Sequence, residues 1–441
     1  MSSDEWRPDA AAAASNWAGN VRFGAHRVHR PDSLDDLRRV VAGSRHVRAL
    51  GTGHCFSTIA DAAAASADGI AGDLVTLDAL PATVEVDPSD GSVTVAASVR
   101  YGDLATRLDA AGFALHNMAS LPHISVAGSI ATGTHGSGDR NGGLATAVTG
   151  IDIVTGGGDL VRMTRESHPD SFAGSIVGLG ALGILARVRL AIEPAYEVTQ
   201  WVYEGMPWDR LRAEVDAVFA SAYSVSVLTR WNAPAVDYVW TKHRGEGSPP
   251  ARWLDARLAD EPRHPVIGLP PAPATPQLGQ PGRWHERLPH FRLEFTPSVG
   301  AELQSEYFVP REHAAAAIDA MRAIGDRLAP VLMVSELRTI AADDLWLSPT
   351  YGRDSMALHF TWAPNTPAVL AAVAEIETAL QPFDPRPHWG KVFTMTPEAV
   401  AGRFDRLDDF GRLRHRVDPD GVFGNAFVDR FAPMIGGPRQ A

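Results

Sequence analysis

The sequence is poor in cysteine, in long apolar runs and in leader-like features. Cys55 is the single cysteine among 441 residues, which excludes an intramolecular disulfide and a thiolate metal site. No apolar run reaches the roughly 18 residues that a membrane-spanning helix needs. Residues 1–16 have neither the basic start nor the apolar core of a signal peptide. We therefore expect a cytoplasmic protein without a membrane span.

Positive charge is also scarce, since 40 Lys and Arg stand against 52 Asp and Glu and give a net charge of −12. Nucleic acids and anionic membranes need a basic surface, so neither is an expected partner. A phosphate ligand would have to be held by backbone N–H groups. The sixteen histidines form no His-x₃-His pair on a predicted helix, so we expect no metal site.

A glycine turn with a histidine follows the predicted strand 46–50. Gly51 and Gly53 permit positive φ and close approach of a ligand, and His54 comes directly after them. Most Gly-His turns have a purely structural role, and these residues alone leave that alternative open. Phe56 occupies the third glycine position of a dinucleotide fingerprint, and no Gly-Lys-Ser/Thr is present. The turn therefore predicts neither a Rossmann fold nor a P-loop.

A second unusual stretch runs from Ser125 to Gly138, where nearly every residue is Gly, Ala, Ser or Thr. Small side chains let consecutive N–H groups face an anion, which suits a diphosphate in a chain with few cations. The alternative is a flexible surface loop. Ile124, Val126 and Ile130 interleave with the small residues and would be exposed in such a loop. We therefore favour a buried ligand cradle.

The amino-acid composition of the chain changes near Glu193-Pro194, and we place a domain boundary there. Nine of the eleven tryptophans follow it. The expected elements of this second half are a helix over 207–222, a strand over 224–231, a proline-rich irregular loop over 245–282, strands over 302–309, 331–340 and 356–362, and helices over 311–328 and 366–380. Their order predicts a sheet with helices on one side.

The opposite side of that sheet carries polar residues. Glu336 and Arg338 are two positions apart and project to one side of a strand, and His359 and Thr361 do the same on the next strand. Pro387–Lys391 then brings another histidine and a lysine. One such strand would be read as a solvent face. Three consecutive segments favour a substrate pocket.

With these motifs in hand, the chain resembles the FAD-linked oxidases of the vanillyl-alcohol oxidase superfamily, and most closely the bacterial alditol oxidases. The specific parts are Gly51–His54, Met118–Gly138, Glu336–Thr339 and His388–Lys391. The resemblance implies an α+β fold with a PCMH-type FAD-binding domain of two α+β subdomains over 14–194, completed by 400–441. A substrate domain over 195–399, with an antiparallel sheet covered by helices, would cover the flavin.

The resemblance also implies FAD linked covalently through its 8α-methyl group to His54. The cofactor-binding positions it implies are Leu50, Gly51, Thr52, Gly53, His54, Cys55, Ser120, Ser125, Gly128, Ala131, Thr132, Gly133, Thr134, Ile184 and His388. Cys55 stands where relatives usually have serine, and we interpret it as a packed or hydrogen-bonding residue, not a second flavin link.

The implied reaction is oxidation of the terminal primary alcohol of a polyol of the xylitol or sorbitol class to the aldose, with dioxygen reduced to hydrogen peroxide. The substrate positions are Ser120, Glu336, Arg338, His359, Thr361 and Lys391, among which Arg338, Lys391 and Glu336 would be catalytic. Ala119 matches a position associated with oxygen access, and a monomer is expected. The proton acceptor stays open among Lys391, His359 and solvent. The alternatives are a sugar-1,4-lactone oxidase or dehydrogenase, and a flavin-binding module without catalysis.

Overall fold

The computed structural model describes residues 15–62, 71–245, 247, 249–295 and 302–436, and the structural statements that follow refer to these residues. Our expectation about residues 1–16 falls mostly outside them, as do residues 14, 63–70 and 437–441 of the expected FAD-binding domain. Helices accompany sheets that are mostly antiparallel, so the predicted α+β class is confirmed.

Two sheets build the first half of the molecule. The first is parallel, with the strand order β1-β3-β2, where β1 is Val28–His29, β2 is Val47–Leu50 and β3 is Asp73–Thr76. The second is antiparallel, with the order β4-β5-β9-β7-β8, formed by β4 (Val84–Asp87), β5 (Ser92–Ala96), β7 (Val148–Val154), β8 (Leu160–Thr164) and β9 (Ile184–Ala191). A small sheet pairs β6 (Phe113–Ala114) with β10 (Glu193–Pro194) next to the predicted boundary.

Short helices connect these strands. Helix α1 (Leu34–Gly43) begins after Ser33, whose hydroxyl accepts the N–H of Asp36 at 3.3 Å and so satisfies one of the free donors of the first turn. The others are α2 (Tyr101–Ala110), α3 (Val126–Ala131) and α4 (Phe172–Ile176). Helix α3 falls inside the small-residue stretch, and its Val126 and Ile130 are fully buried. The stretch is therefore packed, as predicted, and is not a loose surface loop.

A ten-stranded sheet forms the second half, with the order β14-β15-β11-β13-β12-β18-β19-β17-β20 and β16 paired to β11. Its strands are β11 (Glu197–Glu204), β12 (Ser224–Thr229), β13 (Tyr238–Arg244), β14 (Arg252–Trp253), β15 (Ala256–Leu258), β16 (Gly282–Arg283), β17 (Leu303–Pro310), β18 (Leu332–Ile340), β19 (Ser355–Trp362) and β20 (Arg386–Pro387). The proline-rich region contributes only the two-residue and three-residue strands β14, β15 and β16, in agreement with the predicted irregular loop.

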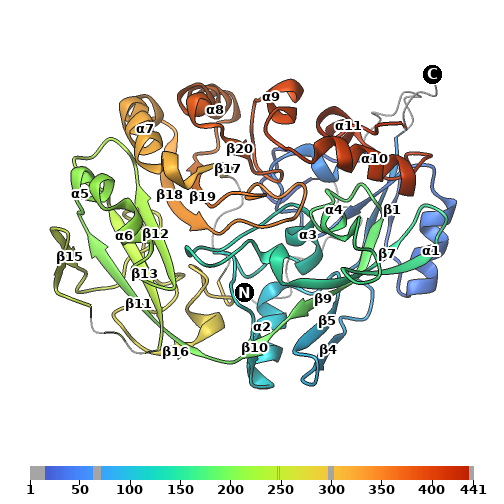
Figure 1. The fold of residues 1–441 in the computed structure, drawn as a ribbon, viewed down its shortest axis with the longest axis horizontal. Coiled ribbons are helices and arrows are strands. Elements are labelled where there is room, and N and C mark those ends of the chain that lie inside the picture. Colours follow the sequence, from blue (N-terminus) through green and yellow to red (C-terminus); the bar gives the residue numbers. More distant parts are fainter. Residues whose placement is uncertain (1–14, 63–70, 246, 248, 296–301, 437–441) are drawn as a thin grey trace.

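Helices α7 (Ala314–Leu328) and α8 (Thr366–Leu380) lie together on one side of strands β17 to β20 (Figure 1). Each buries one apolar stripe, which is the reason a helix with this spacing packs on a sheet. Asn365 caps α8 by accepting the N–H of Ala368, and Pro367 occupies its first turn. Leu337 and Leu358 are fully buried and paired across β18 and β19. The predicted one-sided helix cover is confirmed.

The predicted helix over 207–222 is wrong as a single element. The structure has two short helices, α5 (Trp208–Ala213) and α6 (Val215–Phe219), separated at Glu214, whose φ of −119° is not helical. Trp208 and Leu211 are buried on the first helix and Val218 and Phe219 on the second. Both apolar pairs belong to the main hydrophobic core.

The C-terminal segment returns to the first half of the chain. It contains α9 (Pro397–Ala401), α10 (Leu407–Val417) and α11 (Ala426–Phe431), and α10 packs on α4. The N–H of Val47 on β2 donates to the carbonyl of Val422 at 2.8 Å. The buried Arg48 donates to the carbonyls of Phe423 and Gly180, both at 2.7 Å. This segment therefore fixes the strand that leads into the glycine turn.

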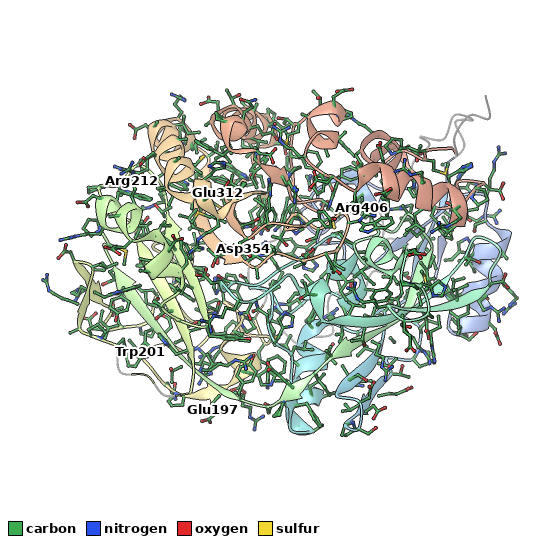
Figure 2. All side chains as sticks on the ribbon, in the orientation of Figure 1. Glu197, Trp201, Arg212, Glu312, Asp354 and Arg406 are labelled. Carbon is green, nitrogen blue, oxygen red and sulfur yellow. The ribbon has the colours of Figure 1, made fainter. Side chains whose placement is uncertain are left out.

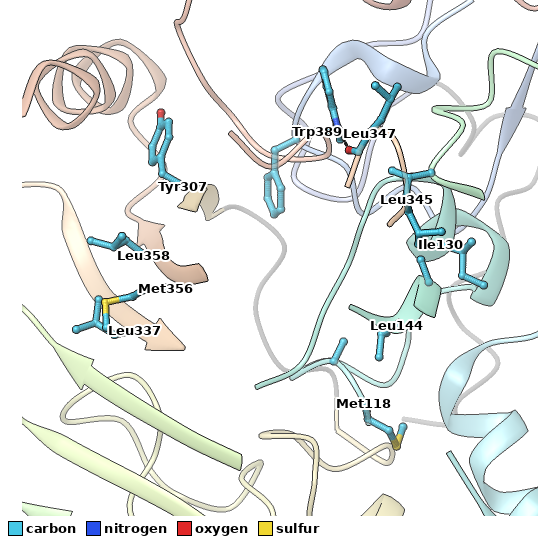
Figure 3. Packing of buried hydrophobic residues seen from close by; sticks show 14 of the residues in the cluster. Met118, Ile130, Leu144, Tyr307, Leu337, Leu345, Leu347, Met356, Leu358 and Trp389 are labelled. Carbon is cyan, nitrogen blue, oxygen red and sulfur yellow. Dashed lines mark hydrogen bonds between the residues drawn. The ribbon is translucent and has the colours of Figure 1, made fainter. Parts of the chain in front are cut away.

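One hydrophobic core continues through both halves (Figure 3). Met118, Ile130 and Leu144 from the first half belong to the same cluster as Leu337 and Met356 from the second. Charged side chains lie outside it: Arg212 on α5, at the edge of the molecule in Figure 2, pairs with Asp319 on α7 at 2.6 Å. The shared core holds the two halves in a fixed relation, so that residues distant in sequence can form one site.

Candidate active site

The two glycine-rich stretches meet at Ser125. A Cβ atom on Gly51 would lie 2.7 Å from the Ser125 hydroxyl, and one on Gly128 would lie 2.8 Å from it, so neither position has room for a side chain without movement. The N–H of Ser125 also donates to the Thr52 hydroxyl at 3.3 Å. Gly53 has a φ of +68°, which glycine adopts without strain. The exposed backbone of both stretches therefore faces the same region, next to the Ser125 hydroxyl.

His54 lies beside this junction and is half-buried. Its ring stacks on Trp17, with ring centroids 5.2 Å apart and an interplanar angle of 23°. Burial, reinforced by His123 and Arg100, lowers the pKa of His54 to about 3. The imidazole is therefore neutral near pH 7 and carries a lone pair that can act as a nucleophile.

The turn that contains His388 and Lys391 packs directly on the glycine turn. The N–H of Phe56 donates to the carbonyl of Gly390 at 2.6 Å, and the Ser57 hydroxyl donates to the carbonyl of Trp389 at 2.8 Å. Lys391 Nζ lies 5.3 Å from the centre of the Phe56 ring. Segments more than 330 residues apart are thus held side by side.

Cys55 takes part in the same contact. A Cβ atom on Gly390 would come within 3.1 Å of Cys55 Sγ. Burial raises the pKa of the Cys55 thiol to about 11, so the sulfur stays protonated near neutral pH. These features agree with our interpretation of Cys55 as a packed residue.

The polar residues predicted on β18 and β19 do share one side of the sheet. Glu336 is paired with His359 across the two strands, and Thr361 lies two positions further along β19. Arg338 Nη1 donates to the Ser120 hydroxyl at 3.4 Å. Glu336, Arg338 and His359 are each less than 10% exposed. The alternative of a solvent-exposed sheet face is therefore wrong.

Strand β17 supplies two members of this site that sequence reasoning missed. Glu306 Oε1 accepts a hydrogen bond from Arg338 Nη2 at 2.7 Å. Gln304 Oε1 contacts His359 Nε2 at 3.2 Å and accepts a hydrogen bond from Lys391 Nζ. The predicted strand 302–309 carries both at alternate positions, so the signal applied to its neighbours was present there too.

Histidines from distant segments support the two carboxylates. His135 Nε2 lies 3.1 Å from Glu306 Oε1, and His290 Nε2 lies 2.8 Å from Glu336 Oε1. Both rings are buried. His135 lies within the stretch 118–138, and nothing in its spacing predicts a carboxylate partner. His290 follows the proline-rich loop and had no sequence signal.

Electrostatics keep both carboxylates ionised. Burial alone would raise the pKa of Glu306, but His135 and Arg338 hold it well below the usual range. Arg338 and His290 do the same for Glu336 against its own burial. Arg338 lies between them, with its Nε 3.6 Å from Glu336 Oε1. The site therefore contains two carboxylates and a guanidinium that are paired with one another, as buried charges require.

The remaining titratable groups are shifted by burial toward their neutral forms. Burial lowers the pKa of His359 and of His388 to about 3 each, and Lys391 adds to the effect on both. Burial lowers the pKa of Lys391 itself to about 8, with Glu306 opposing the shift. Both histidines are therefore neutral at pH 7, while Lys391 is close to its titration point.

Other predicted cofactor positions lie at the end of helix α3 and at the start of strand β9. Thr132 and Gly133 follow α3, and Gly133 has a φ of +75°. Ile184 begins β9 opposite Val154, and its side chain is buried in a small core of the first half with Leu37 and Phe423. The structure therefore brings together the glycine turn, Ser120, Ser125, Gly128, His388 and the β18–β19 residues. Ile184 lies in a core against which Ala49, next to the glycine turn, and Ala127, within the small-residue stretch, also pack.

Among the described residues, no group of His, Cys, Asp and Glu side chains could hold a metal ion. In the same part of the chain, every helix is too short or too polar to cross a bilayer.

Comparison with known proteins places the chain in a class. Residues 25–164 match the FAD binding domain family, and residues 301–431 match the D-arabinono-1,4-lactone oxidase family. A solved structure of cholesterol oxidase from B. sterolicum has the same fold, with a TM-score of 0.77 over 96% of each chain at 16% identity. The fold and the FAD-binding match define an FAD-dependent oxidoreductase.

Similar proteins of known name indicate the family within this class. To the alditol oxidase of Streptomyces sp., the chain is 49% identical over 420 residues. The aligned residues cover 95% of this chain and 98% of the Streptomyces protein. The chain belongs to the alditol oxidase family. It is also 27% identical over 445 residues to L-gulono-1,4-lactone dehydrogenase of Mycobacterium tuberculosis, covering 94% and 98% of the two chains.

Proposed function

We propose that this enzyme oxidises the terminal primary alcohol of a polyol of the xylitol or sorbitol class to the aldose and reduces dioxygen to hydrogen peroxide. The 49% identity to an alditol oxidase across almost the whole chain supports the substrate class. The observation that carries the proposal is the contact between the Gly51–Phe56 turn and the Gly390–Lys391 turn. Through it, the proposed flavin anchor lies next to a buried set of charges.

The residues present fit FAD. Gly51 and Gly128 are exposed although Leu50 and Ser129 beside them are buried, so bare backbone faces the junction of the two glycine-rich stretches. We assign the diphosphate to the stretch from Ser125 to Thr134, and the covalent link to the neutral His54. FAD, when bound, accepts a hydride equivalent from the carbinol carbon and passes two electrons to dioxygen.

The charged groups then have distinct roles. Arg338 and Lys391 stabilise the negative charge that develops on the substrate oxygen, because fixed cations in a dry site act most strongly on charge that appears in the transition state. Glu336 accepts a hydrogen bond from the neighbouring hydroxyl. Ser120, His359 and Thr361 bind hydroxyls further along the polyol. Ala119, which is buried beside Ser120, borders the path for dioxygen.

A lactone-oxidising enzyme is the second candidate, favoured by the match of residues 301–431 and by the Mycobacterium tuberculosis relative. The two reactions separate in a peroxide assay of the purified enzyme. We expect peroxide from xylitol and sorbitol and no turnover of gulonolactone or galactonolactone. The reverse result would replace the alditol proposal by the lactone one.

The covalent link has its own test. After acid precipitation of the purified enzyme, the yellow colour should stay with the protein pellet, and the His54→Ala variant should release its flavin into the supernatant. Flavin in the supernatant of the unaltered enzyme would remove His54 from this role without affecting the proposed reaction.

A further inference from the structure

Lysine is almost absent from this chain. Of the 40 basic residues, two are lysines, Lys242 and Lys391, and the others are arginines. Lys391 lies in the proposed active site. Lys242 lies on β13 and is 1% exposed. Burial lowers its pKa, with Glu336 opposing the shift and Arg338 adding to it. Lysine presents a compact point charge that arginine cannot replace. The chain otherwise uses arginine for its positive charges, yet a lysine lies close enough to Glu336 to interact with its carboxylate.

The contacts of Lys242 lead to that carboxylate. Its ammonium donates to the carbonyls of Leu288 and Pro289, the latter at 3.0 Å, and lies 3.1 Å from Nδ1 of His290. On the other side of the ring, His290 Nε2 is 2.8 Å from Glu336 Oε1. The groups form an unbroken chain from β13 through the loop after the proline-rich region to β18.

The directions of these hydrogen bonds follow from the chemistry of the groups. Burial lowers the pKa of Lys242 to about 7, so below that pH it is an ammonium with only donors, and Nδ1 of His290 then accepts. Burial lowers the pKa of His290, so the ring is neutral and carries its one proton on Nε2. A proton on Nε2 can be donated to Glu336, which is an acceptor. Each donor in the chain therefore fixes the next.

We propose that Lys242 and His290 are positioning residues that fix the His290 tautomer and thereby orient Glu336 toward the polyol. The proposal rests on the proposed function, because Glu336 is the group that it places on substrate. Both contacts described for Glu336, from His290 and from Arg338 Nε, use Oε1. Oε2 is then the oxygen that accepts a substrate hydroxyl.

The arrangement assigns a specificity role to the relay. Glu306 and Ser120 engage the two Nη atoms of Arg338, so Arg338 does not depend on Glu336 for its position. Loss of the relay should therefore weaken recognition of the hydroxyl next to the reacting alcohol more than the chemical step. We expect the KM for xylitol to rise about tenfold in Lys242→Met, as for the loss of one well-placed hydrogen bond, with kcat changed less than threefold.

The tautomer can be read directly by NMR. In enzyme labelled with ¹⁵N-histidine and measured below pH 7, where Lys242 is protonated, the His290 signals, assigned by their loss in His290→Gln, should show protonation at Nε2. A ¹³Cε label on lysine should give two signals, one from each lysine. The signal that remains in Lys391→Met belongs to Lys242. In Lys242→Met, the His290 signals should shift toward Nδ1 protonation. A proton on Nδ1 in the unaltered enzyme would overturn the proposal, and this reading does not require Lys242→Met to fold.

A double-mutant cycle separates a relay from simple packing. Glutamine at position 290 can donate to Glu336 through its amide and has no tautomer for Lys242 to fix. Lys242→Met should therefore raise KM about tenfold in the unaltered background and less than twofold in His290→Gln. An equal effect in both backgrounds would mean that Lys242 has only a packing role. His243→Gln, at the next position of β13, is the matched control and should leave KM unchanged.

The outcomes also separate this inference from the proposed function. If xylitol and sorbitol are not turned over but His290 is protonated at Nε2 and responds to Lys242→Met, the relay stands and the substrate is wrong. If xylitol is turned over and the tautomer does not depend on Lys242, the substrate stands and the relay is wrong.

Discussion

At the scale of single residues, the site depends on charges that compensate one another. Arg338 lies between Glu306 and Glu336, and Oε1 of each carboxylate also contacts a buried histidine. Removing one member of such a buried set leaves another charge without compensation, which costs more than the lost contact. The roles of these residues therefore show best in substitutions that keep the shape and remove the charge.

Glu306→Gln tests whether the charge of Glu306 is needed to hold Arg338 in place. Glutamine keeps the volume but removes the negative charge from Arg338, so Arg338 should shift toward Glu336. We expect kcat to fall at least tenfold and the free energy of unfolding to fall by about 1–3 kcal/mol. Glu375→Gln, which removes an exposed partner of Arg327, should change neither quantity. An unaltered kcat in Glu306→Gln would show that Arg338 does not need this carboxylate.

Lys391 should give the enzyme a pH dependence near pH 8. Because burial lowers its pKa to about 8, the ammonium is present below that pH and lost above it. If the charge stabilises the developing alkoxide, kcat/KM for xylitol should fall as pH rises through about 8, and Lys391→Met should lose at least about a hundredfold. A rate that instead rises through pH 8 and flattens in Lys391→Met would make Lys391 the proton acceptor.

At the scale of elements, the molecule joins two turns that its sequence separates widely. Gly390 lies against Cys55, and hydrogen bonds from Phe56 and Ser57 reach the same turn. The backbone contact leaves little space for an added atom. The position of Lys391 relative to the proposed flavin anchor is therefore set by this packing.

Gly390→Ala should disturb this contact. The new methyl group would lie 3.1 Å from Cys55 Sγ, and overpacking of this kind costs about 1–3 kcal/mol. We expect a lower Tm and a lower flavin content, measured by the ratio of flavin to protein absorbance. Cys55→Ala should restore both in the double variant, because it removes the sulfur. Gly43→Ala, with open space around its Cβ, is the control; a double variant no better than Gly390→Ala would contradict the assigned cause.

At the scale of the whole molecule, buried neutral histidines should make the fold sensitive to acid. His359 and His388 have pKa values of about 3 in the folded state, below the usual value of about 6.5 in the unfolded chain. Between these values the unfolded state binds more protons, so stability falls as pH falls from about 6.5 toward 3. The depressed pKa values of Glu306 and Glu336 act in the same direction at lower pH.

Each such histidine should contribute up to about 1.4 kcal/mol of destabilisation per pH unit in that window. We expect the Tm of the holoenzyme to fall steeply between pH 6 and 4. The His359→Gln variant should show a shallower fall, because it removes one of the groups. A Tm that stays constant down to pH 4 would contradict the burial of these neutral rings.

The sequence by itself determined the elements and the local motifs. The alternation in β18 and β19, the apolar stripes of α7 and α8 and the packed small-residue stretch are local patterns, and the structure has them as predicted. The predicted helix over 207–222 failed because local propensity does not reveal a break that tertiary packing imposes.

Only the tertiary structure decided which residues meet. In the sequence, Glu306 occupies the same place in an alternating pattern as an exposed strand residue would. It is buried because of the strand order and because His135, 171 positions away, contacts it. His290 and Lys242 carry no motif, because a positioning role depends on distances to Glu336 and not on neighbours in sequence. A site built from segments hundreds of residues apart is fixed by a shared core, and that core exists only once the whole chain has folded.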